Sequence, residues 1–224
     1  MKLIIVSILT SFLCLGCDSK TNTADIAYFG GEIVNPKNNY ITIYSKESER
    51  DTIPLDAQNR FIYKFDNLKA GLYHFTHGGE YQTLLIEPKD SILIRLNTND
   101  FDESLVYTGI GSKKNNYFIK AFLNDEVVSK QFYKLQHLEP EIFEKSIYTA
   151  KQQRLDYLER FALEQETSPL FKKIAEASIN YSYYTYKEKY PFGYFGNNKL
   201  IHYKDLPEGF YDYRKDVDFN DVSL

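Results

Sequence analysis

The stretch GIGSKK, residues 109–114, decides the fold because the periodicity of the sequence changes on either side of it. From residue 28 to 110, short runs of β-branched and aromatic residues alternate with turn residues. From residue 111 to 191, apolar residues recur at steps of three and four, the spacing of amphipathic helices. The stretch lacks the spacing of a phosphate-binding loop and follows strands rather than a βα unit. We interpret it as a hinge between two domains.

The strands of the first domain are predicted from alternation. Phe61, Tyr63 and Phe65 share one face of their run, while Ile62 and Lys64 share the other. Many short strands with tight turns and no helical pattern between them favour an antiparallel β-sandwich of roughly seven strands. The clearest strands are expected at residues 41–44, 60–65, 71–75, 83–87 and 91–96.

The second domain is predicted to hold three helices of roughly 20 residues each. Ser112 is expected to cap the first helix, Pro140 to begin the second, and Ser168-Pro169 to begin the third. The helical pattern stops at residues 191–193, and residues 192–224 read as an irregular tail or one short helix. The predicted fold class is therefore α+β, an N-terminal antiparallel β-sandwich (28–110) followed by a helical segment (111–191).

The N-terminus has the layout of an export signal. Lys2 precedes an apolar run of about a dozen residues, too short to span a bilayer comfortably. Leu15-Gly16-Cys17 resembles the cleavage motif of bacterial lipoproteins, which implies a signal peptide at 1–16, lipidation of Cys17 and a polar tether at 17–27. Simple secretion, or a redox or metal role for Cys14 and Cys17, are the alternatives.

Composition excludes some functions. The net charge of −4 has no basic excess to neutralise phosphates, so we expect no nucleic-acid partner. Once Cys14 leaves with the signal peptide and Cys17 is acylated, the chain has no thiol for redox chemistry or zinc. There is no Ser-His-Asp order and no dinucleotide-binding turn, and we expect a protein that is not an enzyme and has no cofactor.

Two clusters are candidate metal sites. His74, His77 and Glu80 lie within seven residues, but side chains three apart on a strand point to opposite faces unless the glycines at 78–79 turn the chain. The acidic run at 97–104 lacks the alternation and the glycine of a calcium loop. We favour a strand end and a solvated loop, and expect no metal.

Residues 181–195, YSYYTYKEKYPFGYF, are unusually rich in tyrosine. Tyr183, Tyr186 and Tyr190 share one helical face. We favour rings that pack against the sandwich with wet hydroxyls. The alternative is a surface that docks a partner, with a protein partner preferred to a glycan because tryptophan is absent.

The β-half carries the strings GGEIVNP, DTIPLD and GLYHFTHGGEYQTLLIEPKDSILIRLNTNDFDESLVYTGIGSKKNN. These resemble the N-terminal region of exported Bacteroidota lipoproteins of the TlpA-like thiol-disulfide oxidoreductase type, over roughly residues 28–215. In that family a β-sandwich and a helical segment precede a thioredoxin domain. The turn at 87–91 matches a family turn that usually has glycine where Lys89 stands.

The resemblance brings no redox site, because no C-x-x-C follows residue 17. We expect a non-catalytic lipoprotein of the cell envelope, anchored to a membrane, facing the periplasm, and acting as a binding or accessory module for another envelope protein. One alternative is the N-terminal half of a TlpA-like enzyme without its catalytic domain. Another is a glycan-binding lipoprotein, with the Tyr183 and Tyr186 rings as the binding surface.

Overall fold

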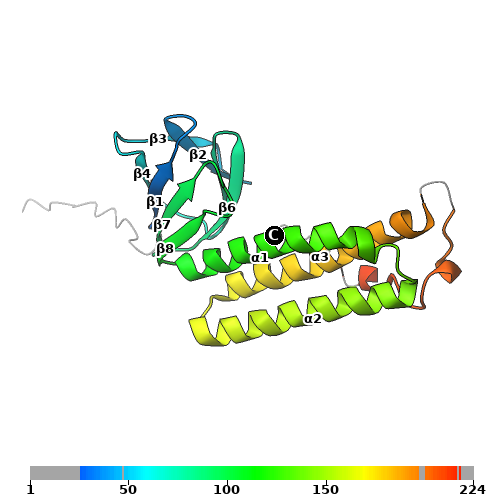
Figure 1. The fold of residues 1–224 in the computed structure, drawn as a ribbon. Helices are drawn as coiled ribbons and strands as arrows, with labels where there is room; N and C mark the ends of the chain where they lie inside the picture. The colour runs from blue at the N-terminus through cyan, green and yellow to red at the C-terminus, as the bar shows by residue number, and fades with distance from the viewer. Residues whose placement is uncertain (1–25, 47, 197–199, 216, 218–224) are drawn as a thin grey trace, which may run out of the picture.

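The computed structural model describes residues 26–46, 48–196, 200–215 and 217. It is an eight-stranded sandwich with three long helices that lie side by side and extend away from it (Figure 1). The predicted α+β class is confirmed. The predicted signal peptide and the lipidation residue Cys17 lie outside the described residues.

Each sheet has four strands. The first sheet has the order β4-β1-β7-β8 and the second β3-β2-β5-β6. The first sheet comprises β1 (Ala27–Val34), β4 (Arg60–Phe65), β7 (Ser91–Asn97) and β8 (Val106–Ile110). The second comprises β2 (Tyr40–Ser45), β3 (Asp51–Pro54), β5 (Gly71–His77) and β6 (Glu80–Ile86).

One strand pair departs from the antiparallel prediction. β1 inserts between β4 and β7 and runs parallel to β7, with Phe29 opposite Ile92. All other pairs are antiparallel. The core lies between the sheets, where the Phe29 ring is 5.3 Å from both Phe61 and Phe75. The predicted alternation therefore orients the side chains correctly, with Phe61 buried and Ile62 exposed.

The helices are α1 (Ser112–Leu135), α2 (Pro140–Gln165) and α3 (Pro169–Phe195). Pro140 begins α2 as predicted, and the Ser168 hydroxyl accepts a hydrogen bond from the Phe171 N–H as the cap of α3. Ser112 is not a cap. It is the first helical residue of α1, after Gly111 in the left-handed conformation.

The third helix does not stop at Pro191 as the sequence suggested. It continues to Phe195, because Tyr190 and Pro191 are buried against neighbouring residues and this packing offsets the missing N–H. The residues after it are also more ordered than an irregular tail. The 3₁₀ turns η2 (Tyr203–Asp205) and η3 (Asp212–Lys215) belong to a C-terminal segment, 200–215, which buries Leu206 and Phe210 against the helices.

Two consecutive asparagines of α1 each bond one edge strand, and the two strands belong to different sheets. Asn115 Oδ1 accepts from the Leu85 N–H on β6 at 2.8 Å, and its Nδ2 donates to the Leu85 carbonyl at 2.8 Å. Asn116 makes the same pair of bonds with Tyr107 on β8, at 3.0 and 2.8 Å. β6 and β8 are edge strands, so these side chains bond backbone groups that no strand pairs. The start of α1 thereby clamps both sheets together.

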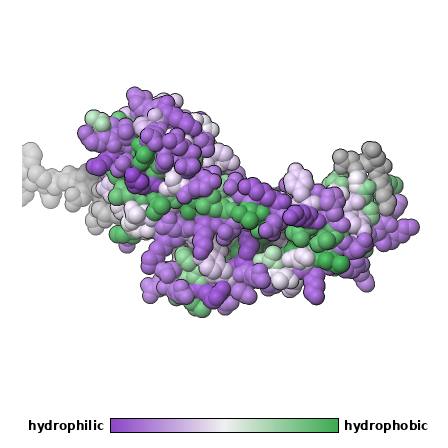
Figure 2. Space-filling model, viewed as in Figure 1, coloured by the Kyte–Doolittle hydropathy of each residue, from purple (hydrophilic) through white to green (hydrophobic). Residues whose placement is uncertain are grey.

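The surface is mostly hydrophilic, with hydrophobic patches on the sandwich and along the helices (Figure 2). Among the described residues, no helix is both long and apolar enough to cross a bilayer.

Candidate functional site

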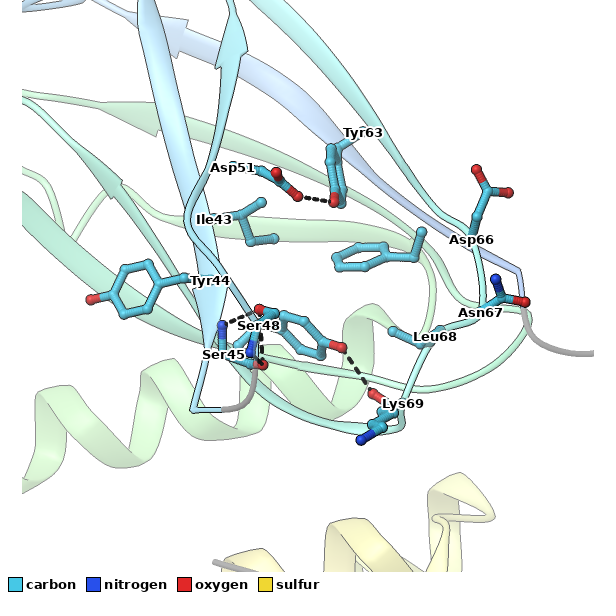
Figure 3. A pocket seen from close by; sticks show the side chains of 12 residues that line it. Ile43, Tyr44, Ser45, Ser48, Asp51, Tyr63, Asp66, Asn67, Leu68 and Lys69 are labelled. Atoms are coloured by element: carbon cyan, nitrogen blue, oxygen red, sulfur yellow. Dashed lines mark hydrogen bonds between the residues drawn. The ribbon is translucent and has the colours of Figure 1, made fainter.

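A pocket opens between the two sheets at one end of the sandwich (Figure 3). Its volume is about 250 Å³. Side chains from both sheets line it, together with the loop between β4 and β5. The lining residues that the argument uses are Ser45, Ser48, Asp51, Tyr63, Phe65 and Tyr73.

Aromatic rings form the inner wall of this pocket. The Phe65 ring lies edge-on to Tyr63 with centroids 4.7 Å apart, and at 5.1 Å from Tyr73. Phe65 is buried and Tyr63 is half-buried. The edge-to-face arrangement fixes the rings and leaves a firm apolar surface for a ligand to contact.

The rim of the pocket is polar. The Tyr63 hydroxyl donates a short hydrogen bond to Asp51, and the two side chains point toward each other in Figure 3. Burial and this hydrogen bond raise the pKa of Tyr63, so its hydroxyl stays protonated. On the other side, the Ser45 and Ser48 hydroxyls lie 3.0 Å apart. Tyr44 and Asp66, although they line the pocket, point away from its centre.

This arrangement suits binding more than catalysis. Hydroxyl and carboxylate groups around an apolar wall recognise a small molecule that carries hydroxyl groups. Catalysis by a serine would require a base in hydrogen-bond reach of its hydroxyl. The Ser48 hydroxyl accepts hydrogen bonds from the backbone N–H and the hydroxyl of Ser45.

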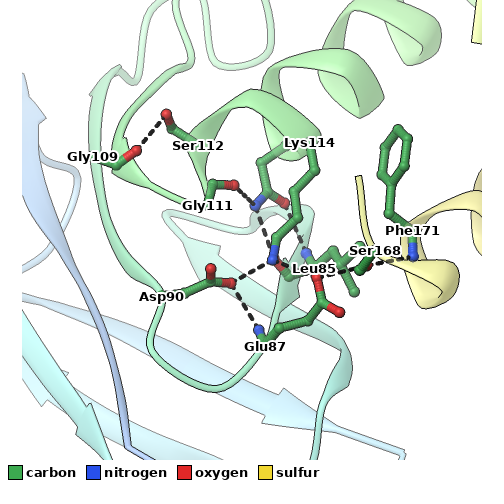
Figure 4. Close-up of polar contacts among 10 residues, drawn as sticks. Leu85, Glu87, Asp90, Gly109, Gly111, Ser112, Lys114, Ser168 and Phe171 are labelled. Carbon is green, nitrogen blue, oxygen red and sulfur yellow. Dashed lines mark hydrogen bonds and ion pairs between the residues drawn. The ribbon is translucent and has the colours of Figure 1, made fainter. Parts of the chain in front are cut away.

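A second polar cluster lies where the sandwich meets the helices (Figure 4). Lys114 Nζ is 2.7 Å from Glu87 Oε2 and 2.5 Å from Asp90 Oδ2. The Ser168 hydroxyl at the start of α3 donates to the same Glu87 oxygen at 3.0 Å. Burial raises the pKa of Asp90, and Lys114 opposes the shift. A Cβ on Gly111 would lie 2.3 Å from Asp90 Oδ1, so only glycine fits there.

The cluster has a structural role. Its carboxylates face Lys114 and the N-terminal turns of α1 and α3, where negative charge is favourable. The stretch that we interpret as a hinge is therefore bonded through Lys114 to Glu87 and Asp90 in the turn after β6, and Ser168 at the start of α3 bonds the same Glu87. Lys114 bonds both carboxylates, and the cluster links the turn after β6 to the starts of α1 and α3.

The three tyrosines of the predicted partner surface lie within the helical segment. Tyr190 is fully buried, stacks on Phe143 at 3.9 Å and donates to the Leu138 carbonyl at 2.7 Å. Tyr186 stacks on Phe132 at 5.0 Å. Tyr183 is half-buried. The rings pack as favoured, but against other helices rather than against the sandwich. Tyr190 contributes to no surface.

The two candidate metal clusters have hydrogen-bonding roles. His77 is buried, accepts from the Lys37 N–H at 3.0 Å and contacts the Tyr40 carbonyl at 2.9 Å through Nδ1. Asp102 accepts from the buried Gln82 side chain at 2.7 Å. Within the described ranges, no group of three or more His, Cys, Asp or Glu residues is placed to hold a metal ion.

Sequence reasoning missed the sandwich-end pocket and the asparagine pair. The pocket joins residues from 43 to 73, and no single motif signals it. The asparagine pair ends the GIGSKKNN string, where two adjacent amides at a helix start were a visible signal.

No family model and no curated protein matches the chain. Among solved structures, a DUF3823 family protein from Parabacteroides merdae ATCC 43184 is similar at 11% identity and a TM-score of 0.24. The similar region covers 38% of this chain and 47% of that protein. So weak a likeness carries no argument about fold or function, and it lends no support to the TlpA-like resemblance.

Proposed function

We propose that the protein is a non-catalytic lipoprotein of the cell envelope, held at a membrane through Cys17 and facing the periplasm. The sandwich is the part of the protein that binds the ligand. The observation that carries the binding role is the sandwich-end pocket, where Asp51, Tyr63 and Ser48 surround an aromatic wall. The Leu15-Gly16-Cys17 sequence supports the anchor.

The pocket suggests the class of ligand. Its volume of about 250 Å³ suits a molecule the size of a single sugar ring or a comparable polar group. The glycan-binding alternative therefore moves from Tyr183 and Tyr186, whose rings pack among the helices, to this pocket. An exposed sugar on an envelope protein or polysaccharide fits its chemistry.

The anchor is tested by fractionating cells that express the wild type or Cys17→Ser. We expect the wild type in the detergent-soluble membrane fraction and Cys17→Ser released from it. Binding is tested on a glycan array with the wild type and Tyr63→Phe, which removes one hydroxyl and keeps the ring. Tyr81→Phe, at an exposed position on β6, is the matched control. Saturable binding that Tyr63→Phe weakens and Tyr81→Phe does not would support the proposal. The absence of binding to any glycan on the array would contradict a sugar ligand.

One observation favours the TlpA-like alternative. Lys89 has a φ of 72°, the left-handed conformation that suits the glycine found in the resembling turn. An adjacent reading frame that encodes a thioredoxin domain with a C-x-x-C motif would favour this alternative over a stand-alone binding module. An unrelated downstream gene would count against it.

A further inference from the structure

We infer that the outer face of the first sheet is a docking surface for an anionic lipid bilayer. The inference rests on the proposed anchor at Cys17, and it concerns how the anchored sandwich lies on the membrane. The face consists of the outward residues of β4, β1, β7 and β8. They are Tyr28, Gly30, Glu32, Arg60, Ile62, Lys64, Ser91, Leu93, Arg95, Val106, Thr108 and Ile110.

Four apolar side chains of this face stay in contact with solvent, three of them on the edge strands β4 and β8. Ile62 is 62% exposed, Ile110 68%, Val106 51% and Leu93 45%. Strand register places Ile62, Gly30, Leu93 and Thr108 in one row across the sheet. A Cβ on Gly30 would lie 2.8 Å from Ile62 Cδ1 and 3.2 Å from Leu93 Cδ2. The glycine thus lets the two side chains close over it into one continuous apolar patch.

Solvent-exposed apolar clusters of this kind mark interaction sites more often than chance exposure. In Figure 2 hydrophobic surface shows through where Figure 1 places β1, β7 and β8. The opposite face of these strands is the sandwich core, with Phe29 and Ile92 fully buried. In addition to its apolar inner face, the sheet therefore has an apolar patch on its outer face that stays exposed to solvent among the described residues.

The charges of the face select the partner. Arg60, Lys64 and Arg95 point outward. Glu32 on the same face lies 3.9 Å from Arg60, and Asp66, just after β4, lies 2.6 Å from Lys64, which leaves a net charge of +1 in a chain whose net charge is −4. A patch that combines apolar side chains with a basic rim matches the interface of a bilayer that contains anionic lipid. A second copy of the chain would instead bring two positive faces together, which is unfavourable.

The tether places this face next to the membrane. Nine residues, 18–26, separate Cys17 from Ala27, so these ten residue steps span at most about 36 Å when extended. Tyr28, on the outer face itself, is the second residue of β1. Its row across the sheet runs Lys64, Tyr28, Ser91 and Ile110, so the first row of the face lies at the end of the sheet where the tether enters.

The test uses the acylated protein in vesicles of phosphatidylethanolamine and phosphatidylglycerol. Because the processed chain has no other free thiol, a single introduced cysteine can carry a fluorophore. Thr108→Cys labels the outer face, and Thr52→Cys on β3 labels an exposed position of the second sheet as the matched control. We expect lipids that carry a nitroxide to quench the label at 108 strongly and the label at 52 weakly.

Two further variants test the chemistry. Leu93→Asp places a charge in the apolar patch and is expected to remove the difference between the labels. Arg95→Gln is expected to weaken docking about fivefold, the factor for one cation near an anionic surface. High salt should also weaken docking, because it screens the attraction between the basic side chains and the anionic lipid. Circular dichroism of each variant checks that it is folded.

Equal quenching of the labels at 108 and 52 would contradict the docking surface. It would leave the lipid anchor untouched, because the intact mass of the same sample reports acylation separately. Dimers in detergent that Leu93→Asp dissociates would also overturn the docking surface, in favour of a second copy. If Cys17 is unmodified, the proposed lipid anchor is wrong. Flotation of the unacylated protein with the same vesicles then tests the docking surface by itself. Flotation that Leu93→Asp abolishes supports it, and the absence of flotation overturns it.

Discussion

Replacing Asn115 tests whether the start of α1 holds the sandwich together. Asn115 is 1% exposed, and its amide bonds both the N–H and the carbonyl of Leu85 on the edge strand β6. A third bond reaches the Gly111 carbonyl at 3.2 Å. Asn115→Ala removes all three and leaves the two backbone groups of Leu85 buried without a partner.

The size of the effect follows from those two groups. A buried donor or acceptor that loses its partner costs about 1–2 kcal/mol, so Asn115→Ala should lower the free energy of unfolding by about 3 kcal/mol. That is a large share of the ~5–15 kcal/mol typical of a folded domain. Asn116→Ala removes the equivalent bonds to Tyr107, but Asn116 is half-buried, so water can enter the space that its side chain leaves. We expect a loss of about 1 kcal/mol there.

Urea unfolding of the wild type and the two variants, followed by circular dichroism, measures both losses. The clamp predicts one cooperative transition whose midpoint falls far more for Asn115→Ala than for Asn116→Ala. Equal losses for the two variants would refute the reasoning. So would a separate early transition of the helices in the wild type, because the sheets and helices would then unfold independently.

Three further predictions concern particular residues. Lys89→Gly should raise the free energy of unfolding by about 0.5–1 kcal/mol, because glycine relieves the strain of a φ of 72°. Burial lowers the pKa of His77 below 6.5, and the Lys37 N–H bonds its Nε2, so the unfolded chain binds a proton that the folded chain excludes. The free energy of unfolding should therefore fall as the pH drops from 6.5 to the lower folded-state pKa of His77. Thermal melts between about pH 5 and 7.5 measure this fall. Hydrogen bonds from Arg214 lower the pKa of Glu188 below 4.5, so the pair stabilises the C-terminal segment above that pH and is lost as the pH falls through the folded-state value. Hydrogen exchange of residues 200–215 measures this loss.

Each of these predictions has a control. Lys89→Ala keeps a Cβ in the left-handed conformation, and a stability gain equal to that of Lys89→Gly would contradict the strain. His77→Gln lacks the titrating group, and an unchanged dependence of the melting temperature on pH would assign that dependence elsewhere. Glu188→Gln removes the carboxylate, so exchange of the C-terminal segment that still accelerates in acid would contradict the role of the pair.

The sequence predicts this fold best where local patterns coincide with burial. The run that contains Phe61, Ile62 and Phe65 alternates strictly, and its buried and exposed faces follow that alternation. Pro140 and Ser168 mark helix starts through backbone chemistry that operates within a few residues. These features depend on neighbours in the chain, and so a single sequence reveals them.

Features that depend on distant residues were not predictable in the same way. The parallel pairing of β1 with β7 joins residues more than sixty positions apart. The helix passes through Pro191 because Tyr190 packs on Phe143, and the helical period alone does not indicate that partner. Tyr186 and Tyr190 pack on Phe132 of α1 and Phe143 of α2, and not on the sandwich as the sequence analysis favoured.

The same difference between local and distant residues applies to the docking surface and to the pocket. The exposed alternation of Ile62 and Lys64 was visible in the sequence, but the row that joins Ile62 to Leu93 exists only once the strand order is known. The pocket around Asp51 and Tyr63 requires the two sheets to face each other at one end.

The central claim is that Cys17 anchors this protein to a membrane, and intact-mass analysis of the protein purified from membranes tests it most directly. The account predicts a chain that begins at Cys17 and carries the added mass of a diacylglyceryl group, with or without a further acyl chain. A chain that retains both Cys14 and Cys17 without lipid, whose mass changes by two hydrogens on reduction, would contradict it.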